Sequence, residues 1–271
     1  MSSLNRKLAP LSDAAWRSID NEAGKVLKVM LAGRKLVDFN GPLGWETSAI
    51  DIGRIEDTKS RGDSNVGVHI RKVQPLAELR REFEIARTEI DAIDRGAKDS
   101  DLAPVVNAAR DMALAEDSAL FGGLPEADIG GICPLSEHKP LKISKEYHNY
   151  PGVVARAIST LREAGVDGPY AIALGRRCLT GLNETTVNGF PVLNHVASLL
   201  DIPPIAAPAI DGALVLSTRG GDFELSVGRD FSIGYLDHDS RRVSFFIDES
   251  FTFQVLGAEA AVPLVYGQPN R

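Results

Sequence analysis

The chain has 271 residues, with 44% apolar and 25% charged residues, so it can bury one large core or two modest ones. Its formal charge of −7 argues against a general nucleic-acid binder, because such proteins usually carry a basic face. No apolar run is long enough to cross a membrane, and the N-terminal residues lack the apolar core of a signal peptide. Cys133 and Cys178 follow no metal or redox spacing, so we expect a cytoplasmic protein with reduced thiols.

An amphipathic helix is predicted between Ser12 and Gly33. Ser12 is a good N-cap residue, and Gly33 suits the position after the last helical turn. Apolar side chains recur at helical spacing between them and are widened by two leucines: Trp16, Ile19, Ala23, Val26, Leu27, Met30 and Leu31. So wide an apolar face needs cover from the chain's own core, from another subunit or from a guest molecule.

Residues 49–81 are predicted to form one long hairpin. Ile50, Ile52 and Ile55 alternate on the way out, and apolar residues alternate again from Val66 to Ile70 on the way back. The segment 57–65 between them is polar and turn-forming. A two-stranded ribbon is marginal alone in water, so a neighbouring subunit is a reasonable partner for it.

The rest of the chain indicates a sheet-and-helix domain that is interrupted by a smaller unit. A long helix is predicted at about Pro104 to Phe121, and residues 124–150 form an irregular boundary. Residues 151–218 alternate between helix and strand, which is typical of a small α/β unit. From Phe223 to Val255 the pattern is strictly β, with one apolar and one polar face.

Catalytic motifs are missing from the sequence. The sequence contains no phosphate-binding loop and no dinucleotide-binding fingerprint. It also contains no nucleophile elbow and no zinc-protease motif. The cluster 237–239 could ligate a divalent ion, but a polar turn is the simpler interpretation, and we expect no metal. Glu116 and Asp117 suit capping or ion pairing better than acid–base work. Cys178, His195 and Asp201 could form a nucleophilic set, which spacing alone does not support.

Several segments, in the right order along nearly the whole chain, resemble the encapsulin shell proteins. They are Leu8-Ala9-Pro10-Leu11, Trp16, Gly33-Arg34-Lys35, Val37-Asp38, Gly41-Pro42-x-Gly44-Trp45-Glu46, Glu89-Ile90-Asp91 with Arg95-Gly96, Ala115-Glu116-Asp117 with Phe121-x-Gly123, Gly165-Val166-Asp167-Gly168-Pro169-Tyr170, Arg219-Gly220-Gly221-Asp222-Phe223, Ser232-Ile233-Gly234-Tyr235 and Glu249-Ser250-Phe251-Thr252-Phe253. The resemblance implies the α+β fold of tailed-phage major capsid proteins. Residues 1–48, 82–135 and 219–271 would then form a peripheral domain with the N-terminal arm and helix, 49–81 an extended hairpin loop, and 136–218 an axial domain.

The resemblance also implies a function. The chain would self-assemble into a closed icosahedral shell, of the order of sixty copies in the smallest form, around a cargo enzyme such as a ferritin-like protein or a peroxidase. A short C-terminal targeting peptide of the cargo would dock on the inner wall, at positions matching Val26, Leu27, Met30, Leu31, Arg34, Asp38, Asp230, Phe231, Ile233 and Tyr235. A pore would be lined by Asn183, Glu184, Thr185, Thr186, Val187, Asn188 and Gly189.

Other functions remain open at this point. Some encapsulins hold a flavin against an aromatic residue, but Thr88 stands at that position here, so we expect no cofactor. The alternatives are a hydrolase, protease or bacteriocin-like protein that uses the region of Cys178 and His195, and a capsid that packages nucleic acid, which the acidic charge disfavours.

Overall fold

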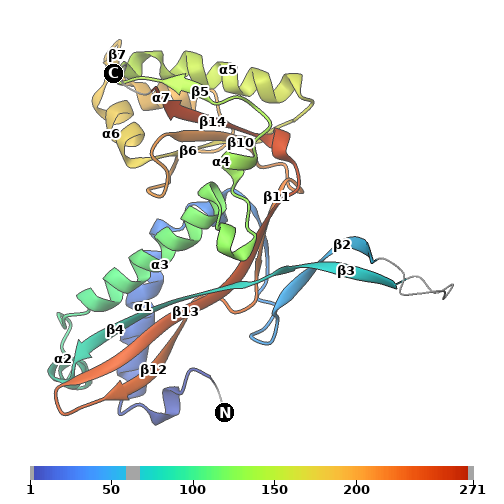
Figure 1. Ribbon diagram of the computed structural model, residues 1–271. Coiled ribbons are helices and arrows are strands. Elements are labelled where there is room, and N and C mark those ends of the chain that lie inside the picture. The colour runs from blue at the N-terminus through green and yellow to red at the C-terminus, as the bar shows by residue number, and fades with distance from the viewer. Residues whose placement is uncertain (1–2, 59–67, 268–271) are drawn as a thin grey trace.

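The computed structural model describes residues 3–58 and 68–267. An α/β unit lies above a helix-and-sheet unit, and a two-stranded ribbon projects sideways from the junction between them (Figure 1). The chain passes between the two units several times. Both α3 and β13 run from the lower unit up to the junction. The tip of the expected hairpin, residues 59–67, lies outside the described residues.

The lower, peripheral unit packs three helices, α1 to α3, on one face of a five-stranded sheet. Its core joins apolar residues from α1, α3, β4, β12 and β13, and Trp16 meets Phe245 edge to face with ring centroids 5.6 Å apart. The elements are α1 (Asp13–Met30), α2 (Arg87–Asp94), α3 (Ala103–Gly122), β1 (Asp38–Asn40), β4 (Ala77–Ala86), β11 (Phe223–Val227), β12 (Ser232–His238) and β13 (Arg242–Val255).

The predicted start of α1 is confirmed, and its predicted end is wrong. The Ser12 side chain accepts a hydrogen bond from the Ala15 N–H at 3.1 Å, as an N-cap should. The helix ends at Met30, and Gly33 lies three residues later in a short 3₁₀ turn with no positive φ. A Cβ at Gly33 would lie 2.5 Å from Leu120 Cδ2, so the glycine allows the end of α1 to pack closely on α3.

The ribbon consists of β2 (Ala49–Thr58) and β3 (Val68–Pro75), with apolar side chains left open to solvent. Ile55, Ile70 and Val73 are 62%, 55% and 50% exposed in the isolated chain. The ribbon ends at Pro75 rather than at the expected residue 81, because β4 leaves it and pairs with β13 along the sheet.

The upper, axial unit has a five-stranded sheet in the order β5-β14-β10-β6-β9 with short helices around it. Its buried side chains continue through Phe223, Phe251 and Phe253 into one end of the sheet below, whereas the core under α1 to α3 is a separate cluster. The elements are α4 (Ile132–Leu135), β5 (Leu141–Ile143), α5 (Tyr150–Glu163), β6 (Tyr170–Leu174), α6 (Arg176–Glu184), β7 (Thr186–Val187), β8 (Phe190–Pro191), α7 (Val192–Ala197), β9 (Ile205–Ala206), β10 (Ala213–Ser217) and β14 (Ala261–Tyr266); the 3₁₀ turns are η1 (Arg6–Leu8), η2 (Gly33–Lys35), η3 (Pro125–Ala127), η4 (Tyr147–Asn149) and η5 (Ala258–Ala260).

Strand β14 corrects the expectation that all of 219–271 belongs to the peripheral domain. It lies between β5 and β10 in the axial sheet. Pro263 hides this central strand from a sequence reading, because proline cannot donate to a β-ladder. The sheet accommodates Pro263 because the pairing of β14 with β5 begins one residue later, at Leu264.

Candidate binding groove and the Arg34 cluster

A groove with a volume of about 400 Å³ runs between α1 and the edge strand β12. Helix α1 supplies one wall, β12 and the connection before it supply the other, and the N-terminal arm closes one end. The groove is lined by Leu4, Arg6, Asp20, Ala23, Gly24, Leu27, Phe231, Ser232, Ile233 and Ile247.

The residues predicted for the docking site divide into three groups. Those that line the groove are Leu27, Phe231 and Ile233. Those that pack into or against the core beside it are Val26, Met30, Leu31 and Tyr235. The charged ones have partners of their own: Arg34 lies in a cluster of carboxylates, which includes Asp230, and Asp38 accepts a hydrogen bond from the Gly221 N–H at 2.6 Å.

The two leucines are not the excess apolar surface that the sequence suggested. Leu27 and Leu31 are only 9% and 7% exposed and belong to the peripheral core. The stripe on α1 is wide because the helix packs against both α3 and the sheet. Substituting Leu31 by aspartate would therefore disturb the core as well as any docking site.

Arg6 holds the N-terminal arm across the end of the groove. Its guanidinium donates to the Ile233 carbonyl at 2.8 Å and to the Asp20 carboxylate at 2.8 and 2.5 Å, and it lies 4.3 Å from the centre of the Trp16 ring. The Tyr235 N–H donates to the Leu4 carbonyl at 2.9 Å, so the arm also covers part of the edge of β12. Sequence reasoning missed this clip, because its members are distant in sequence and share no spacing.

Gly24 opens the α1 side of the groove. It is exposed, and a Cβ built on it meets no atom within 4 Å. Glycine inside a helix costs about 0.5–1 kcal/mol relative to alanine. Gly24 therefore lowers the stability of α1 slightly but leaves the α1 side of the groove unobstructed.

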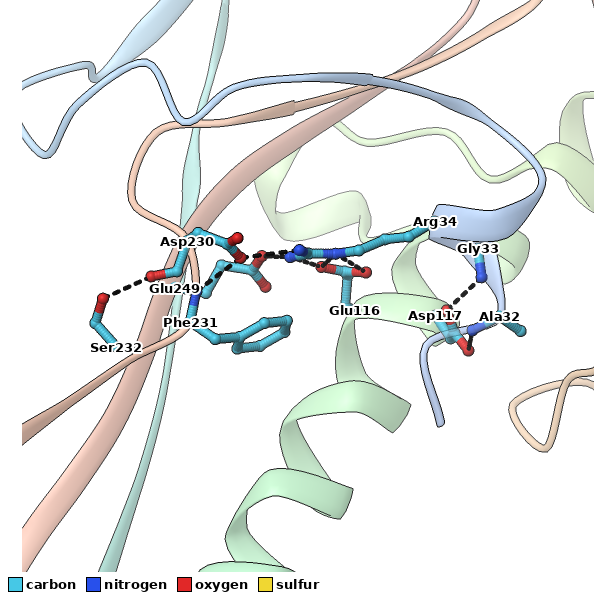
Figure 2. A network of polar contacts seen from close by, with 9 residues as sticks. All are labelled: Ala32, Gly33, Arg34, Glu116, Asp117, Asp230, Phe231, Ser232 and Glu249. Atoms are coloured by element: carbon cyan, nitrogen blue, oxygen red, sulfur yellow. Dashed lines mark hydrogen bonds and ion pairs between the residues drawn. The ribbon is translucent and has the colours of Figure 1, made fainter. Parts of the chain in front are cut away.

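Next to the groove, one arginine meets three carboxylates (Figure 2). Arg34, just after α1, donates to Glu116 of α3 at 2.7 Å through Nη2 and 2.9 Å through Nε, and to Asp230 at 2.9 Å. Its Nη2 also contacts Glu249 of β13. The side chains of Glu116 and Glu249 are fully buried. The ion-pair interpretation of Glu116 is thereby confirmed.

Asp117, which follows Glu116 on α3, holds the segment just after α1. Its carboxylate accepts the N–H groups of Ala32 at 2.9 Å and Gly33 at 2.8 Å (Figure 2). Burial raises the pKa of Asp117 to about 6, although the two N–H donors lower it and so limit the rise. Asp117 therefore has a structural, capping role, as the sequence suggested.

The cluster also positions one wall of the groove. Asp230 and Phe231 lie in the connection between β11 and β12, and the Asp230 carboxylate accepts the Phe231 N–H at 2.8 Å. The guanidinium of Arg34 lies 4.8 Å from the centre of the Phe231 ring. Arg34 thus joins α1, α3 and β13 to the segment that carries Phe231 into the groove.

The predicted pore segment forms a small hairpin at the end of α6 rather than a loop between two helices. Asn183 and Glu184 complete α6, and β7 and β8 follow as a two-residue pair. Asn188 and Gly189 have φ of 52° and 82°, the positive values that a type I′ turn needs at both central positions. The hairpin lies at the far end of the axial unit (Figure 1).

The residues of the alternative nucleophilic set have separate partners. Cys178 is buried against the hydroxyl groups of Tyr150 and Tyr266 at 3.1 and 3.2 Å, and burial raises the pKa of its thiol. The His195 ring contacts the Val187 carbonyl at 3.4 Å, and Asp201 accepts the Tyr170 N–H. The geometry gives no nucleophile–base pair among these residues.

The prediction that the polar cluster 237–239 is a turn is right only for Asp239, because Asp237 and His238 are the last residues of β12 and pair with β13. The Asp239 carboxylate accepts the N–H groups of Arg241 at 2.6 Å and Arg242 at 2.7 Å, which lowers the pKa of Asp239. Within residues 3–58 and 68–267, no group of three or more potential ligands is placed to hold a metal ion. In the same ranges, no helix is long and apolar enough to cross a membrane.

Comparison with known proteins identifies the family of this chain and finds its fold in solved structures. A family profile described as "Encapsulating protein for peroxidase" matches residues 1–252. A type 1 encapsulin shell protein of Rhodospirillum rubrum is 51% identical over 270 residues, with 97% of this chain and 96% of that protein covered. The corresponding shell protein of Rhodococcus erythropolis is 45% identical over 264 residues, covering 97% of this chain and all of that protein.

Solved structures share the architecture at low sequence identity. A virus-like particle from Pyrococcus furiosus superposes with a TM-score of 0.63 at 15% identity, covering 91% of this chain and 97% of that one. The fold is that of phage-capsid-like proteins, as the sequence predicted. The relatives are named as type 1 encapsulin shell proteins, so the chain is not itself an enzyme. The chain belongs to the encapsulin shell protein family and forms a multimeric shell.

Proposed function

We propose that the chain assembles into a closed icosahedral compartment that encloses a cargo enzyme, and that a short peptide at the C-terminus of the cargo docks in the α1–β12 groove. The observation that carries the assembly proposal is the ribbon of β2 and β3. Its apolar side chains are exposed in the isolated subunit and need a neighbour to cover them. A closed shell supplies that neighbour to every copy.

Two measurements test assembly and content together. A closed shell elutes in the void volume of a size-exclusion column, whereas a small oligomer elutes later. The ratio of absorbance at 260 nm to that at 280 nm then distinguishes protein cargo from packaged nucleic acid. A small oligomer, or a particle with a nucleic-acid spectrum, would contradict the proposal.

The groove supports the docking part of the proposal by its shape and lining. Leu27 and Ile233, nearly buried, and the half-buried Phe231 line it between α1 and β12. Burying one leucine of a guest peptide there would contribute roughly 1.5–3 kcal/mol. The acidic side chain in the lining, Asp20, is already paired with Arg6, so we propose that recognition depends mainly on apolar side chains.

Gly24→Phe is expected to empty the shell without preventing its assembly. The new ring would fill the open floor of the groove, and replacing a helical glycine removes its conformational cost. Losing one buried leucine of the guest would weaken docking roughly tenfold or more. The cargo-to-shell ratio of purified particles, measured by gel densitometry after co-expression with the cargo gene, gives the result.

Gly24→Ala is the matched control, because its methyl group enters open space and leaves most of the groove free. It should load cargo normally and stabilise α1. Full loading of Gly24→Phe shells would place the docking site elsewhere.

For the small hairpin after α6 we propose a role as a pore at a symmetry axis. Glu184 is exposed at the end of α6, and a ring of such carboxylates would favour cations over anions. Glu184→Lys should therefore slow the influx of a divalent cation into the shell and speed that of an anionic quencher of an enclosed fluorophore. Unchanged influx of both would show that ions cross elsewhere; Glu163→Lys, on α5, is the charge-matched control.

A further inference from the structure

The cluster around Arg34 has an excess of buried negative charge. Three carboxylates surround a single guanidinium, and two of them, Glu116 and Glu249, meet the same nitrogen, Nη2. If all three were ionised, the cluster would carry a net charge of −2; Asp230 is 43% exposed, so the two buried carboxylates, Glu116 and Glu249, would still leave one buried negative charge uncompensated by Arg34. Burying an uncompensated charge is costly, and two carboxylates that share one site favour keeping a proton.

No other described cation reaches the cluster to balance this charge. Lys35 is exposed beside Arg34 and donates to the Val29 carbonyl at 3.1 Å. On β4, next to β13, Arg81 pairs with Asp111 of α3 at 3.1 Å. The neighbouring acid Asp117 points to the N–H groups at the end of α1 and adds negative charge nearby.

Glu249 is the carboxyl group best suited to hold the proton. One of its oxygens contacts Arg34, and the other, Oε2, is buried with no hydrogen-bond partner among the described residues. A proton on Oε2 therefore removes a buried charge without breaking a contact. Burial and the nearby Glu116 carboxylate both raise the pKa of Glu249, and Arg34 lowers it by less.

We propose that Glu249 is protonated in the folded subunit at neutral pH, and that losing this proton loosens the junction at which α1, α3, β13 and the Phe231 segment meet. The junction would then respond to alkaline pH, and the groove wall formed by Phe231 would respond with it. This inference concerns the subunit itself and does not depend on what the groove binds.

The sign of the pH dependence follows from linkage. Because the pKa of Glu249 is higher in the folded state than its ordinary value of 4.5, the folded state binds more protons than the unfolded state between the two values. Stability is therefore greatest below the ordinary value and falls as pH rises toward the folded pKa. Within that window the folding equilibrium constant falls up to tenfold per pH unit, or about 1.4 kcal/mol.

Glu249→Gln tests the proposal on assembled particles, because glutamine keeps the size and an oxygen for Arg34 but carries no charge. Glu84→Gln is the control: it removes a half-exposed carboxylate that pairs with Arg242 on the same sheet. From about pH 6 to about pH 9, the thermal midpoint should fall less for Glu249→Gln than for the wild type or the control.

Infrared spectroscopy supplies a readout that a purely structural role would not change. At about pH 8, where Asp117 with its pKa of about 6 is ionised, the wild type should show the carbonyl band of a protonated carboxyl group. Glu249→Gln should lack this band, and Glu84→Gln should keep it. If Glu249→Gln does not fold, Glu116→Gln serves instead, since its loss relieves the crowding and should also remove the band. A wild type without the band, or equal pH dependence in variant and control, would overturn the proposal.

Discussion

Removing residues 54–66 from the ribbon is expected to abolish closed particles and leave soluble subunits or open fragments. The deletion takes away the second half of β2 and the turn-forming segment after it, including Ile55, which is 62% exposed in the single chain. The peripheral and axial cores lie outside the ribbon, so the subunit should still fold. Size-exclusion chromatography and negative-stain electron microscopy measure the outcome.

The control for this deletion is Leu236→Ser, which removes an apolar side chain that is 40% exposed from β12, outside the ribbon. It should leave assembly intact if the ribbon, rather than exposed apolar surface in general, holds subunits together. Intact particles of normal thermal stability after the deletion would mean that the ribbon is dispensable.

Arg34→Met should destabilise the subunit by about 3–5 kcal/mol, the usual cost of breaking a buried ion pair by removing one partner. Arginine 34 is the cation that Glu116, Glu249 and Asp230 share, and two of those carboxylates are fully buried. The urea midpoint of purified subunits or particles, followed by tryptophan fluorescence, reports the change.

Arg242→Met is the matched control, because it breaks an ion pair with Glu84 in which both side chains are at least half exposed. Exposed pairs of this kind contribute only about 0–1 kcal/mol. A similar loss of stability in both variants would show that the Arg34 cluster stabilises the subunit no more than an exposed ion pair does.

Periodic patterns allowed much of the fold to be predicted from the sequence. The alternation from Val243 to Val255 marks β13, and the apolar stripe with its Ser12 cap marks α1. Pro263 concealed β14, since its tolerance depends on where the neighbouring strand begins to pair. The end of α1 was misplaced because Gly33 serves close packing on Leu120, which no local signal encodes.

The groove was predictable in outline and not in detail. The resemblance puts the docking site beside α1 and β12, where the structure has a groove, and three of the residues it names, Leu27, Phe231 and Ile233, line that groove. That a peptide docks there stays a prediction. The Arg6–Asp20 clip and the Arg34 cluster join residues far apart in the chain, so no spacing reveals them. Leu31 illustrates the opposite difficulty: an apolar residue on a wide stripe can be core or surface, and only the packing decides.

The late position of two strands in the chain bears on how a subunit is made. Strand β13 pairs with β4, β11 and β12, and β14 lies in the middle of the axial sheet. A ribosome that has not yet released residues 242–266 therefore holds a chain whose two sheets both lack an interior strand. The ribbon is synthesised early, but it cannot be presented on a folded body until synthesis is nearly complete. We therefore expect newly made chains to become competent for association only as whole subunits.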